Sequence, residues 1–274
     1  MSKTAEGQSG GGAEVRQGSL SSAPPPLRSS ATICGIPVAN LTEDEAVAAI
    51  GELISKGGSH YAGVVNAAKI VAANRDAQLK QVLLNADLVT ADGMSVVWAS
   101  RLLGHPLKQR VTGIDLFQRL VGQAAQGGWS VYFLGAREES VRGTVERFKT
   151  DYPTLRVAGY RNGYFEESES NAAADAIKQS NADLLFVAMG SPAQEHWIAS
   201  QLARSGARFA LGVGGSFDHV SGLAVRAPRW MQRAGLEWLY RLLREPRRMW
   251  RRYLIGNSAF IWMVVRQRLA GDKR

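Results

Sequence analysis

Short apolar runs alternate with longer amphipathic stretches along most of the chain. Buried strands are indicated at residues 60–66, 86–91, 129–136 and 182–190 and from Arg208 onward, with a short strand pair at 32–38 and a shorter strand at 155–160. A helical pattern follows most of these runs. Strands that alternate with helices predict an α/β fold, here a Rossmann-like, twisted, mostly parallel sheet flanked by helices.

Local start signals place several of the helices. Thr42 and Glu45 form a capping box at the start of the first one. Further helices are expected at residues 67–74, 113–127 and 137–150, and Pro192 suits the first position of another. The stretch after residue 93 is also helical, and one of its faces is apolar: Met94, Val97, Trp98 and Leu102.

Two polar residues directly follow predicted strands, at the edge of a parallel sheet where ligands bind. Asp92 follows the run 86–91 and is the leading candidate for catalysis. Asn66 ends the run 60–66, where its amide can bind a ribose or sugar hydroxyl. Both residue types are also good helix N-caps, so the local sequence leaves a cap and a site residue open for each.

Other candidate ligand-binding residues lie in later segments. Arg110 presents a planar, permanently charged group to phosphate oxygens, or is a solvated loop arginine. Gln194, in the first turn of a predicted helix, is expected to face the crevice. Gly214 and Gly215 allow backbone N–H groups to approach a phosphate or nucleotide closely. Asp218 can accept hydrogen bonds from ribose hydroxyls or a base, or be a turn carboxylate.

Neither a metal nor a redox cofactor is expected. Glu195 and His196 point about 100° apart on a helix, and His105 and His219 lack partners at ligand spacing. The chain has no Asp-x-Asp motif of the kind that many sugar-nucleotide enzymes use to hold a divalent ion. Its glycine cluster does not match Gly-x-Gly-x-x-Gly, which disfavours a nicotinamide-dependent dehydrogenase.

Composition separates three segments. Residues 1–30 are rich in Gly, Ser and Pro without an apolar signal region, which predicts a disordered leader and a cytoplasmic protein. A single cysteine, Cys34, fits a reducing compartment. Residues 226–274 contain 13 Lys and Arg and three acidic residues, whereas residues 1–225 contain 20 and 21. The net charge of +9 therefore belongs to the C-terminal segment, and residues 31–225 form the predicted α/β core.

The basic segment also holds four of the seven tryptophans, at positions 230, 238, 250 and 262. Arginine and tryptophan on amphipathic helices are typical of an element that lies on an anionic membrane surface. The apolar run at 253–265 is shorter than the roughly 20 residues that span a bilayer. The segment is thus interpreted as a peripheral membrane appendage. An oligomer interface remains an alternative, and nucleic acid is disfavoured because no binding module accompanies the charge.

Six motifs in the same order resemble those of the WecG/TagA/CpsF glycosyltransferases. They are ADGMS at 91–95, RVTGID at 110–115, MGSPAQEHW at 189–197, GVGGSFD at 212–218, RAP at 226–228 and GLEWLYRLLREP at 235–246. The resemblance extends from about residue 33 to residue 255. Their order along the chain makes the resemblance far more specific than any single motif.

The resemblance implies an inverting, metal-independent transfer from a UDP-sugar to a polyprenyl-pyrophosphate-linked sugar at the inner face of a bacterial membrane. It implies that Asp92 is the general base and that Asn66, Gln194 and Asp218 line the donor pocket. Arg110 would bind phosphate. Three arginines of the appendage would neutralise the leaving diphosphate in place of a metal: Arg241, Arg248 and Arg251.

One position departs from the family pattern. The family often has Thr-x-Asn where this chain has Val64-Val65-Asn66, so a hydroxyl expected near the sugar is missing. The donor sugar is therefore open: N-acetylmannosamine is the family's best-known cargo, whereas exopolysaccharide relatives such as the xanthan enzyme GumM transfer glucose. A different class of function is a non-catalytic scaffold that binds UDP and docks on a membrane partner.

Overall fold

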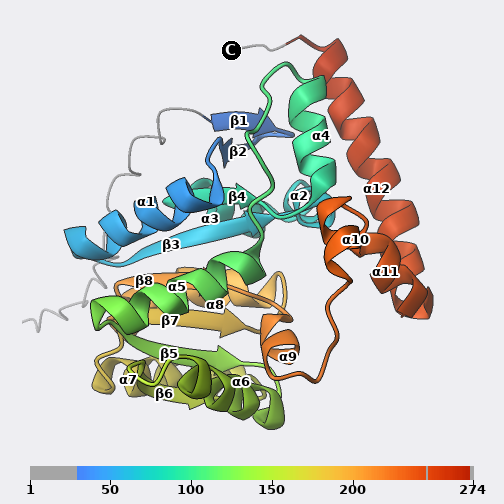
Figure 1. Ribbon diagram of the computed structural model, residues 1–274. Helices are drawn as coiled ribbons and strands as arrows, with labels where there is room; N and C mark the ends of the chain where they lie inside the picture. Colours follow the sequence, from blue (N-terminus) through green and yellow to red (C-terminus); the bar gives the residue numbers. More distant parts are fainter. Residues whose placement is uncertain (1–29, 245, 272–274) are drawn as a thin grey trace, which may run out of the picture.

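The computed structural model describes residues 30–244 and 246–271, apart from the side chains of residues 233, 241 and 247–255. At its centre is a parallel sheet of six strands in the order β4-β3-β8-β7-β5-β6 (Figure 1). The strands are β3 (His60–Val65), β4 (Leu88–Ala91), β5 (Ser130–Gly135), β6 (Arg156–Arg161), β7 (Leu184–Ala188) and β8 (Phe209–Gly212). The predicted fold class is confirmed.

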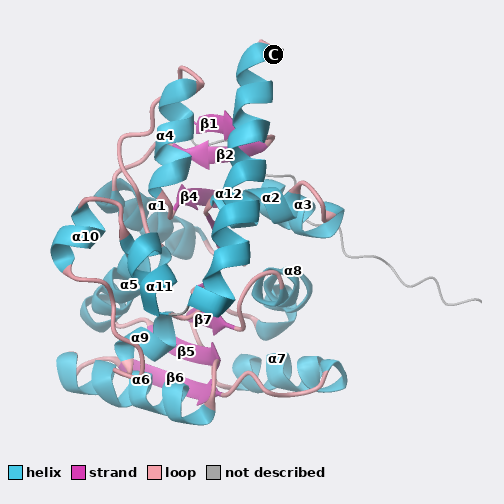
Figure 2. Cartoon of the chain, turned by 90° about the vertical axis from the view of Figure 1, so that its right-hand side faces the viewer, coloured by secondary structure: helices cyan, strands magenta, loops and turns pink. Residues whose placement is uncertain are grey.

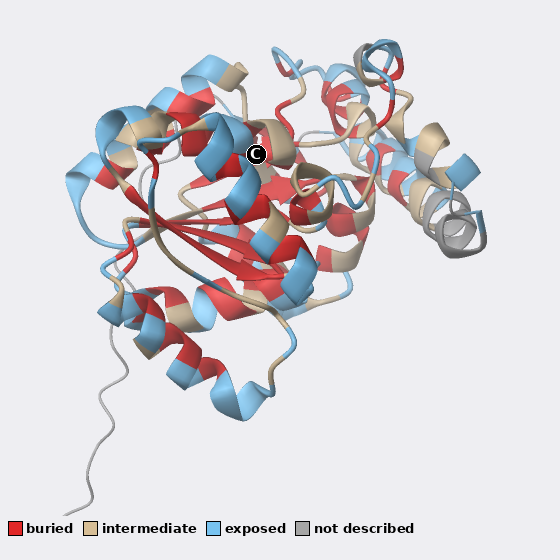
Figure 3. Ribbon diagram, turned by 60° about the horizontal axis from the view of Figure 1, so that its bottom comes forward, coloured by how far each residue is buried: buried red, intermediate tan, exposed pale blue. Residues whose placement is uncertain are grey.

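Helices cover both faces of the sheet because side chains alternate along each buried strand. In β7, Phe186 faces α1 (Glu43–Lys56), α5 (Gly113–Gly127) and α6 (Glu138–Asp151), whereas Val187 faces α7 (Ser170–Gln179) and α8 (Ala193–Ser205). Strands β4, β5, β7 and β8 are accordingly buried along their whole length, whereas the edge strand β6 is partly exposed (Figure 3). Phe117 of α5 lies at the centre of the first face, with its ring centroid 4.6 Å from that of Phe186.

A second group of elements covers the β3 and β4 end of the sheet. It consists of the antiparallel pair β1 (Ser30–Ile33) and β2 (Ile36–Ala39) with α2 (Ala67–Ala73), α3 (Ala77–Leu84) and α4 (Met94–Leu102). The predicted strand pair and the Thr42 capping box are both present. Helices α3 and α7 were not predicted, and α8 begins at Ala193, one residue after the expected Pro192.

The basic C-terminal segment folds back onto the core. After α9 (Ser216–Val220), the chain forms α10 (Arg229–Arg233), α11 (Glu237–Arg244) and α12 (Pro246–Leu269), and α12 runs beside α4 (Figure 2). Phe260 and Val264 of α12 are buried in the same hydrophobic cluster as Ile70 and Val97. Residues on both sides of the predicted boundary at 225 and 226 thus share one core, and the division into domains stays an interpretation.

Two sequence predictions concern the ends of the chain and the membrane. The predicted leader lies outside the described residues except for Ser30, which begins β1. Among the helices that the structure describes, none combines the length and the apolar character needed to cross a bilayer.

Candidate active site

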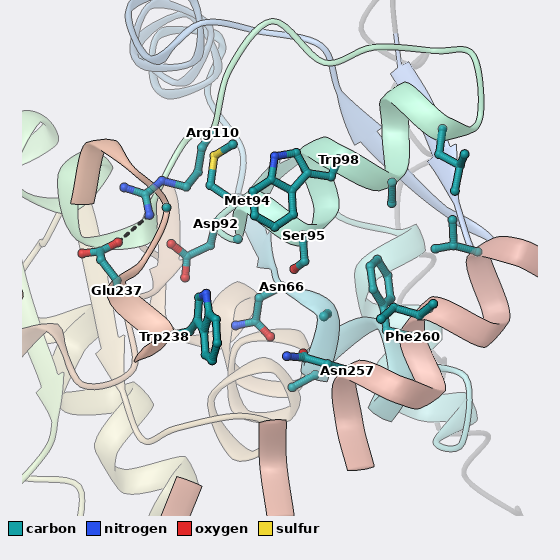
Figure 4. Close-up of a pocket in the computed structure, with 18 of the residues that line it drawn as sticks. Asn66, Asp92, Met94, Ser95, Trp98, Arg110, Glu237, Trp238, Asn257 and Phe260 are labelled. Carbon is teal, nitrogen blue, oxygen red and sulfur yellow. Dashed lines mark hydrogen bonds and ion pairs between the residues drawn. The ribbon is translucent and has the colours of Figure 1, made fainter. Parts of the chain in front are cut away.

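Asn66 and Asp92 come together because they follow two neighbouring parallel strands. Val65 of β3 pairs with Ala91 of β4, so the residue after each strand emerges at the same sheet edge. The Asp92 N–H donates to the carbonyl oxygen of Val65 at 2.8 Å, which fixes the backbone there. The two side chains therefore border one space at the carboxyl edge of the sheet (Figure 4).

Asp92 is not the N-cap of the helix that follows it. Helix α4 begins at Met94, its N-cap is Gly93, and no side chain caps it. A Cβ at Gly93 would lie 3.4 Å from the Cβ of Asn66, so the chain passes close to β3 at this turn. The Asp92 carboxylate instead points into a cleft of about 440 Å³, which we call the Asp92 cleft (Figure 4).

Asn66 does act as a helix cap. Its Oδ1 accepts a hydrogen bond of 3.0 Å from the backbone N–H of Lys69 and so caps α2. The side chain also lines the Asp92 cleft. The cap uses only the amide oxygen and leaves its NH₂ group as a donor toward the cleft, so the two roles proposed for Asn66 are compatible.

The Asp92 cleft has one polar end and one apolar end. The polar end contains Asn66, Asp92, Arg110 and Glu237, and two further polar residues, Ser95 and Asn257, line the cleft elsewhere (Figure 4). The rest of the lining comes from α2, α4, α11 and α12 and is mostly apolar: Ala67, Ala68, Met94, Trp98, Ala99, Leu102, Leu236, Trp238, Phe260, Ile261, Val264 and Val265. A cleft of this size and composition is typical of a small-molecule site with a few polar groups that orient the ligand.

Arg110 belongs to an ion-pair network that ties the C-terminal segment to the core. Its guanidinium donates to Glu237 of α11, which also accepts from Arg226 at 3.2 Å. Arg226 in turn donates two hydrogen bonds, of 2.6 and 3.1 Å, to Asp115 at the start of α5. We call Asp115, Arg226, Glu237 and Arg110 the anchor network. The solvated alternative for Arg110 is wrong because its side chain is only 15% exposed and is paired.

The anchor network controls the ionisation of Asp115. Burial by itself raises the pKa of this carboxyl, but the hydrogen bonds from Arg226 and Thr112 outweigh burial and hold the pKa below its ordinary value. Asp115 is therefore ionised at neutral pH, and its charge holds Arg226 in place.

The side chain of Gln194 is buried and hydrogen-bonded within the protein, and it does not line the Asp92 cleft. It is 2% exposed, accepts from the Gly214 N–H at 2.9 Å and donates to Glu195 at 2.9 Å. A Cβ at Gly212 would lie 2.5 Å from Gln194 Nε2, so only glycine leaves room for this amide. Gly214 therefore uses its N–H inside the protein, whereas Gly215 has open space beside it.

Glu195 connects Gln194 to a buried ion pair. Lys69 of α2 donates to Glu195 at 2.7 Å, and both side chains are less than 10% exposed. Burial raises the pKa of Glu195, but the charge of Lys69 and its hydrogen bond outweigh burial, so the pKa falls below its ordinary value. The pair fixes the first turn of α8 against α2, at the sheet edge that carries Asn66.

Asp218 lies at a separate part of this edge. It is in α9, after β8, and accepts a hydrogen bond of 2.7 Å from Ser140 at the start of α6. The predicted residues thus form two groups: Asn66, Asp92 and Arg110 line the Asp92 cleft, whereas Gln194, Gly214, Gly215 and Asp218 follow β7 and β8 and do not line it.

The three appendage arginines expected near the leaving group cannot be placed. The side chains of Arg241, Arg248 and Arg251 lie outside the described residues. Among the residues that the structure describes, no group of three or more His, Cys, Asp or Glu side chains is arranged to hold a metal ion.

Comparison with known proteins assigns the family. A family model described as the Glycosyl transferase WecG/TagA/CpsF family matches residues 31–274. The chain belongs to this family. It is 42% identical over 201 residues to an N-acetylglucosaminyldiphosphoundecaprenol N-acetyl-beta-D-mannosaminyltransferase of Bacillus spizizenii, a match that covers 73% of this chain and 77% of the relative. A protein of the same name from Bacillus subtilis is 37% identical over 190 residues, covering 69% and 73%.

Most residues that line the cleft of this glycosyltransferase were not predicted from the sequence, among them Glu237, Trp238 and Asn257. Glu237 and Trp238 belong to the motif GLEWLYRLLREP, in which only an arginine was predicted to be a site residue. Asn257 belongs to α12. The charge pattern gave a signal for Glu237, because it is one of only three acidic residues among the last 49. No local signal placed Asn257, since its position depends on how α12 packs on α2.

Proposed function

We propose that this protein is an inverting, metal-independent glycosyltransferase. It transfers a sugar from a UDP-sugar to a polyprenyl-pyrophosphate-linked sugar in the synthesis of a cell-surface or secreted polysaccharide. The observation that supports the proposal most directly is the Asp92 carboxylate, which is not a helix cap and points into a cleft beside Asn66 and Arg110 in a chain of this family.

In the proposed reaction, a hydroxyl of the acceptor sugar attacks C1 of the donor sugar. A new C1–O bond forms while the bond from C1 to the UDP oxygen breaks, and UDP leaves with the electron pair. Asp92 takes the hydroxyl proton as the attack proceeds, because an alcohol is a strong nucleophile only once that proton is being removed. Attack from the face opposite UDP inverts the configuration at C1. The relatives' names specify a beta product, which fits inversion of an α-linked donor.

The leaving diphosphate requires positive charge, which arginines provide without a metal. Arg110 is the described cation at the polar end of the cleft, and Arg241, Arg248 and Arg251 are further candidates on the C-terminal segment. Asn66 is proposed to bind a donor hydroxyl. Gln194, the Gly214–Gly215 turn and Asp218 are proposed to position the nucleotide part of the donor at the ends of β7 and β8.

The relatives' names support N-acetylmannosamine as the first donor to test and N-acetylglucosaminyl-diphosphoundecaprenol as the first acceptor. Glucose is the second donor to test, because Val64 stands where a threonine is common. An acceptor held in a bilayer, together with the basic Arg- and Trp-rich segment, supports a peripheral location on the cytoplasmic face of the membrane.

The proposal is tested with a panel of UDP-hexoses and UDP-N-acetylhexosamines, a polyprenyl-diphosphate-linked N-acetylglucosamine acceptor, and EDTA throughout. Product from one donor, with β configuration by NMR, is the expected result. Transfer that appears only when a divalent ion is added in excess over the EDTA would reject metal independence. Binding of UDP without transfer from any donor, with folded protein and intact acceptor, would favour the non-catalytic scaffold.

A further inference from the structure

The apolar end of the Asp92 cleft lies between two helices that are far apart in sequence. We call it the α4–α12 groove, and six residues line it: Trp98, Ala99 and Leu102 of α4, and Ile261, Val264 and Val265 of α12. The groove is continuous with the polar end that holds Asp92, because all these residues border the same cleft. A ligand that reaches Asp92 can therefore extend along the groove.

The groove opens to the surface through exposed apolar side chains. Trp98 is 50% exposed and Leu102 is 52% exposed, although both belong to the apolar face predicted for α4. On the facing helix, Ile261 is 61% exposed and Val265 is 41% exposed. Apolar side chains that line one opening from both sides indicate a site for an apolar ligand or surface.

The last turns of α12 continue this surface. Trp262 and Leu269 are 61% and 82% exposed, and the guanidinium of Arg266 lies 5.4 Å from the centre of the Trp262 ring. Arg268 adds a second cation in the last turn. Apolar side chains bordered by arginines suit the boundary between lipid tails and anionic headgroups.

We propose that the α4–α12 groove binds the isoprenoid chain of the acceptor, starting at the units next to its diphosphate. The inference rests on the proposed function, and it assigns the orientation of the acceptor: its sugar lies at Asp92, its diphosphate lies between the sugar and the groove, and its chain leaves between Trp98 and Ile261 into the bilayer. A cleft of about 440 Å³ holds the head and the first units, so the rest of the chain remains in lipid.

The polarity of the cleft favours this occupant over a second copy of the protein. An isoprenoid-linked sugar diphosphate is polar at one end and apolar at the other, and the cleft likewise combines a polar end that holds Asp92 with an apolar lining that includes Ile261 and Val265. A second copy would cover the exposed rim without filling the interior at Ala99 and Val264, which are 5% and 3% exposed.

The first test compares two acceptors that carry the same diphosphate-linked sugar, one on a methyl group and one on a three-unit isoprenoid chain. The wild type is expected to prefer the isoprenoid acceptor in kcat/KM. Trp98→Gln combined with Ile261→Gln is expected to lower this preference about tenfold, which corresponds to about 1.4 kcal/mol. Both side chains are at least half exposed, so the substitutions remove apolar contact without opening the core. Tyr164→Ser, which removes a 77% exposed ring outside the cleft, is the matched control.

A second test does not depend on catalysis. Farnesyl diphosphate with a benzophenone at the far end of its chain is photolysed with the full-length protein, and the labelled peptides are identified by mass spectrometry. Labels in residues 94–102 and 256–265 are expected. An unchanged chain-length preference in the double variant would overturn the groove assignment. So would labels in other elements, or labelling that decreases as a higher protein concentration produces dimers. Labels in the expected peptides with no transfer by the wild type would reject the proposed function but keep the isoprenoid site.

Discussion

Arg110 donates a hydrogen bond to Glu237 and thereby joins the loop before α5 to the first turn of α11. Glu237 is also bonded to Arg226, which Asp115 holds. The guanidinium proposed to meet phosphate is thus paired with a carboxylate in the same cleft. A diphosphate that binds Arg110 must compete with Glu237, so ligand binding at this end is coupled to the position of α11.

Replacing Glu237 with glutamine tests this competition. Glu237→Gln keeps the shape of the side chain but removes a negative charge from the polar end of the cleft, so inhibition by UDP is expected to become roughly tenfold stronger. Arg110→Gln is expected to weaken it by a similar factor. The measurement is the inhibition constant of UDP for each variant. If neither substitution changes that constant, the pair only anchors α11.

Asp92→Asn tests the general base. The amide is nearly isosteric but cannot take the acceptor proton, so kcat is expected to fall by roughly 100-fold to 10,000-fold while UDP binding stays close to that of the wild type. Stopped assays give kcat and calorimetry gives the affinity for UDP. Asp44→Asn on α1, whose side chain is 81% exposed, is the matched control. Wild-type turnover in Asp92→Asn would remove this residue from the chemistry.

Gly212→Ala tests whether the buried Gln194 amide matters for the donor. The new Cβ would lie 2.5 Å from Gln194 Nε2 and would displace an amide that has no free space. We expect a loss of about 1–3 kcal/mol in unfolding free energy and a several-fold rise in the KM for the donor. Gly215→Ala is the companion variant, since its Cβ meets nothing within 4 Å. A rise in KM without loss of stability in Gly215→Ala would place the donor over that turn, whereas wild-type kinetics in Gly212→Ala would exclude a donor role for Gln194.

The sequence was sufficient for the parts of this fold that local patterns determine. The strands in the runs 60–66 and 86–91 and the capping box at Thr42 depend on periodicity and caps, and they appear where expected. The position of Asn66 and Asp92 at the carboxyl edge of the sheet was also expected, whereas their proximity depends on the pairing of β3 with β4, which no local pattern indicates. Helix α3 was not predicted. Its N-cap, Asp76, follows another helix and not a strand, so the strand-helix alternation does not indicate a helix start there.

Long-range packing determined what the sequence could not show. An apolar face on α4 predicts burial, but it does not say whether the partner is the sheet or a helix more than 150 residues later. The structure places Val97 in the core and leaves Trp98 at the groove with α12. The sequence likewise indicates a phosphate as the partner of Arg110 and does not indicate its ion pair with Glu237. Glu237 lies 127 residues away, and no local pattern connects the two residues.

The lowered pKa of Asp115 predicts how acid affects stability. Its pKa in the folded protein lies below the ordinary value of 3.8, so the unfolded chain binds the proton first as the pH falls. The stabilisation is therefore complete above about pH 4 and is lost as the pH falls through the folded pKa. Asp115→Asn is expected to lower the unfolding free energy at pH 7 by about 1–3 kcal/mol and to flatten its fall between pH 5 and pH 3. Urea unfolding at several pH values measures both effects, and parallel curves would contradict the assignment.

Removing two cations from the end of α12 tests membrane association. Each arginine near an anionic surface contributes about 1 kcal/mol to binding, so Arg266→Gln with Arg268→Gln is expected to weaken binding to anionic vesicles roughly 30-fold. Binding to neutral vesicles should change little, because Trp262, Ile261 and Leu269 remain exposed there. Arg142→Gln with Arg147→Gln is the control, because it removes the same charge from α6, which packs on β6 at the opposite edge of the sheet.

Added salt provides a second measurement of the same interaction. Because screening weakens the attraction between arginines and anionic headgroups, added salt should reduce vesicle binding of the wild type more than that of the α12 variant. Equal losses in the two double variants would mean that net charge, and not the position of α12, determines binding, and the peripheral orientation assigned to α12 would then be wrong.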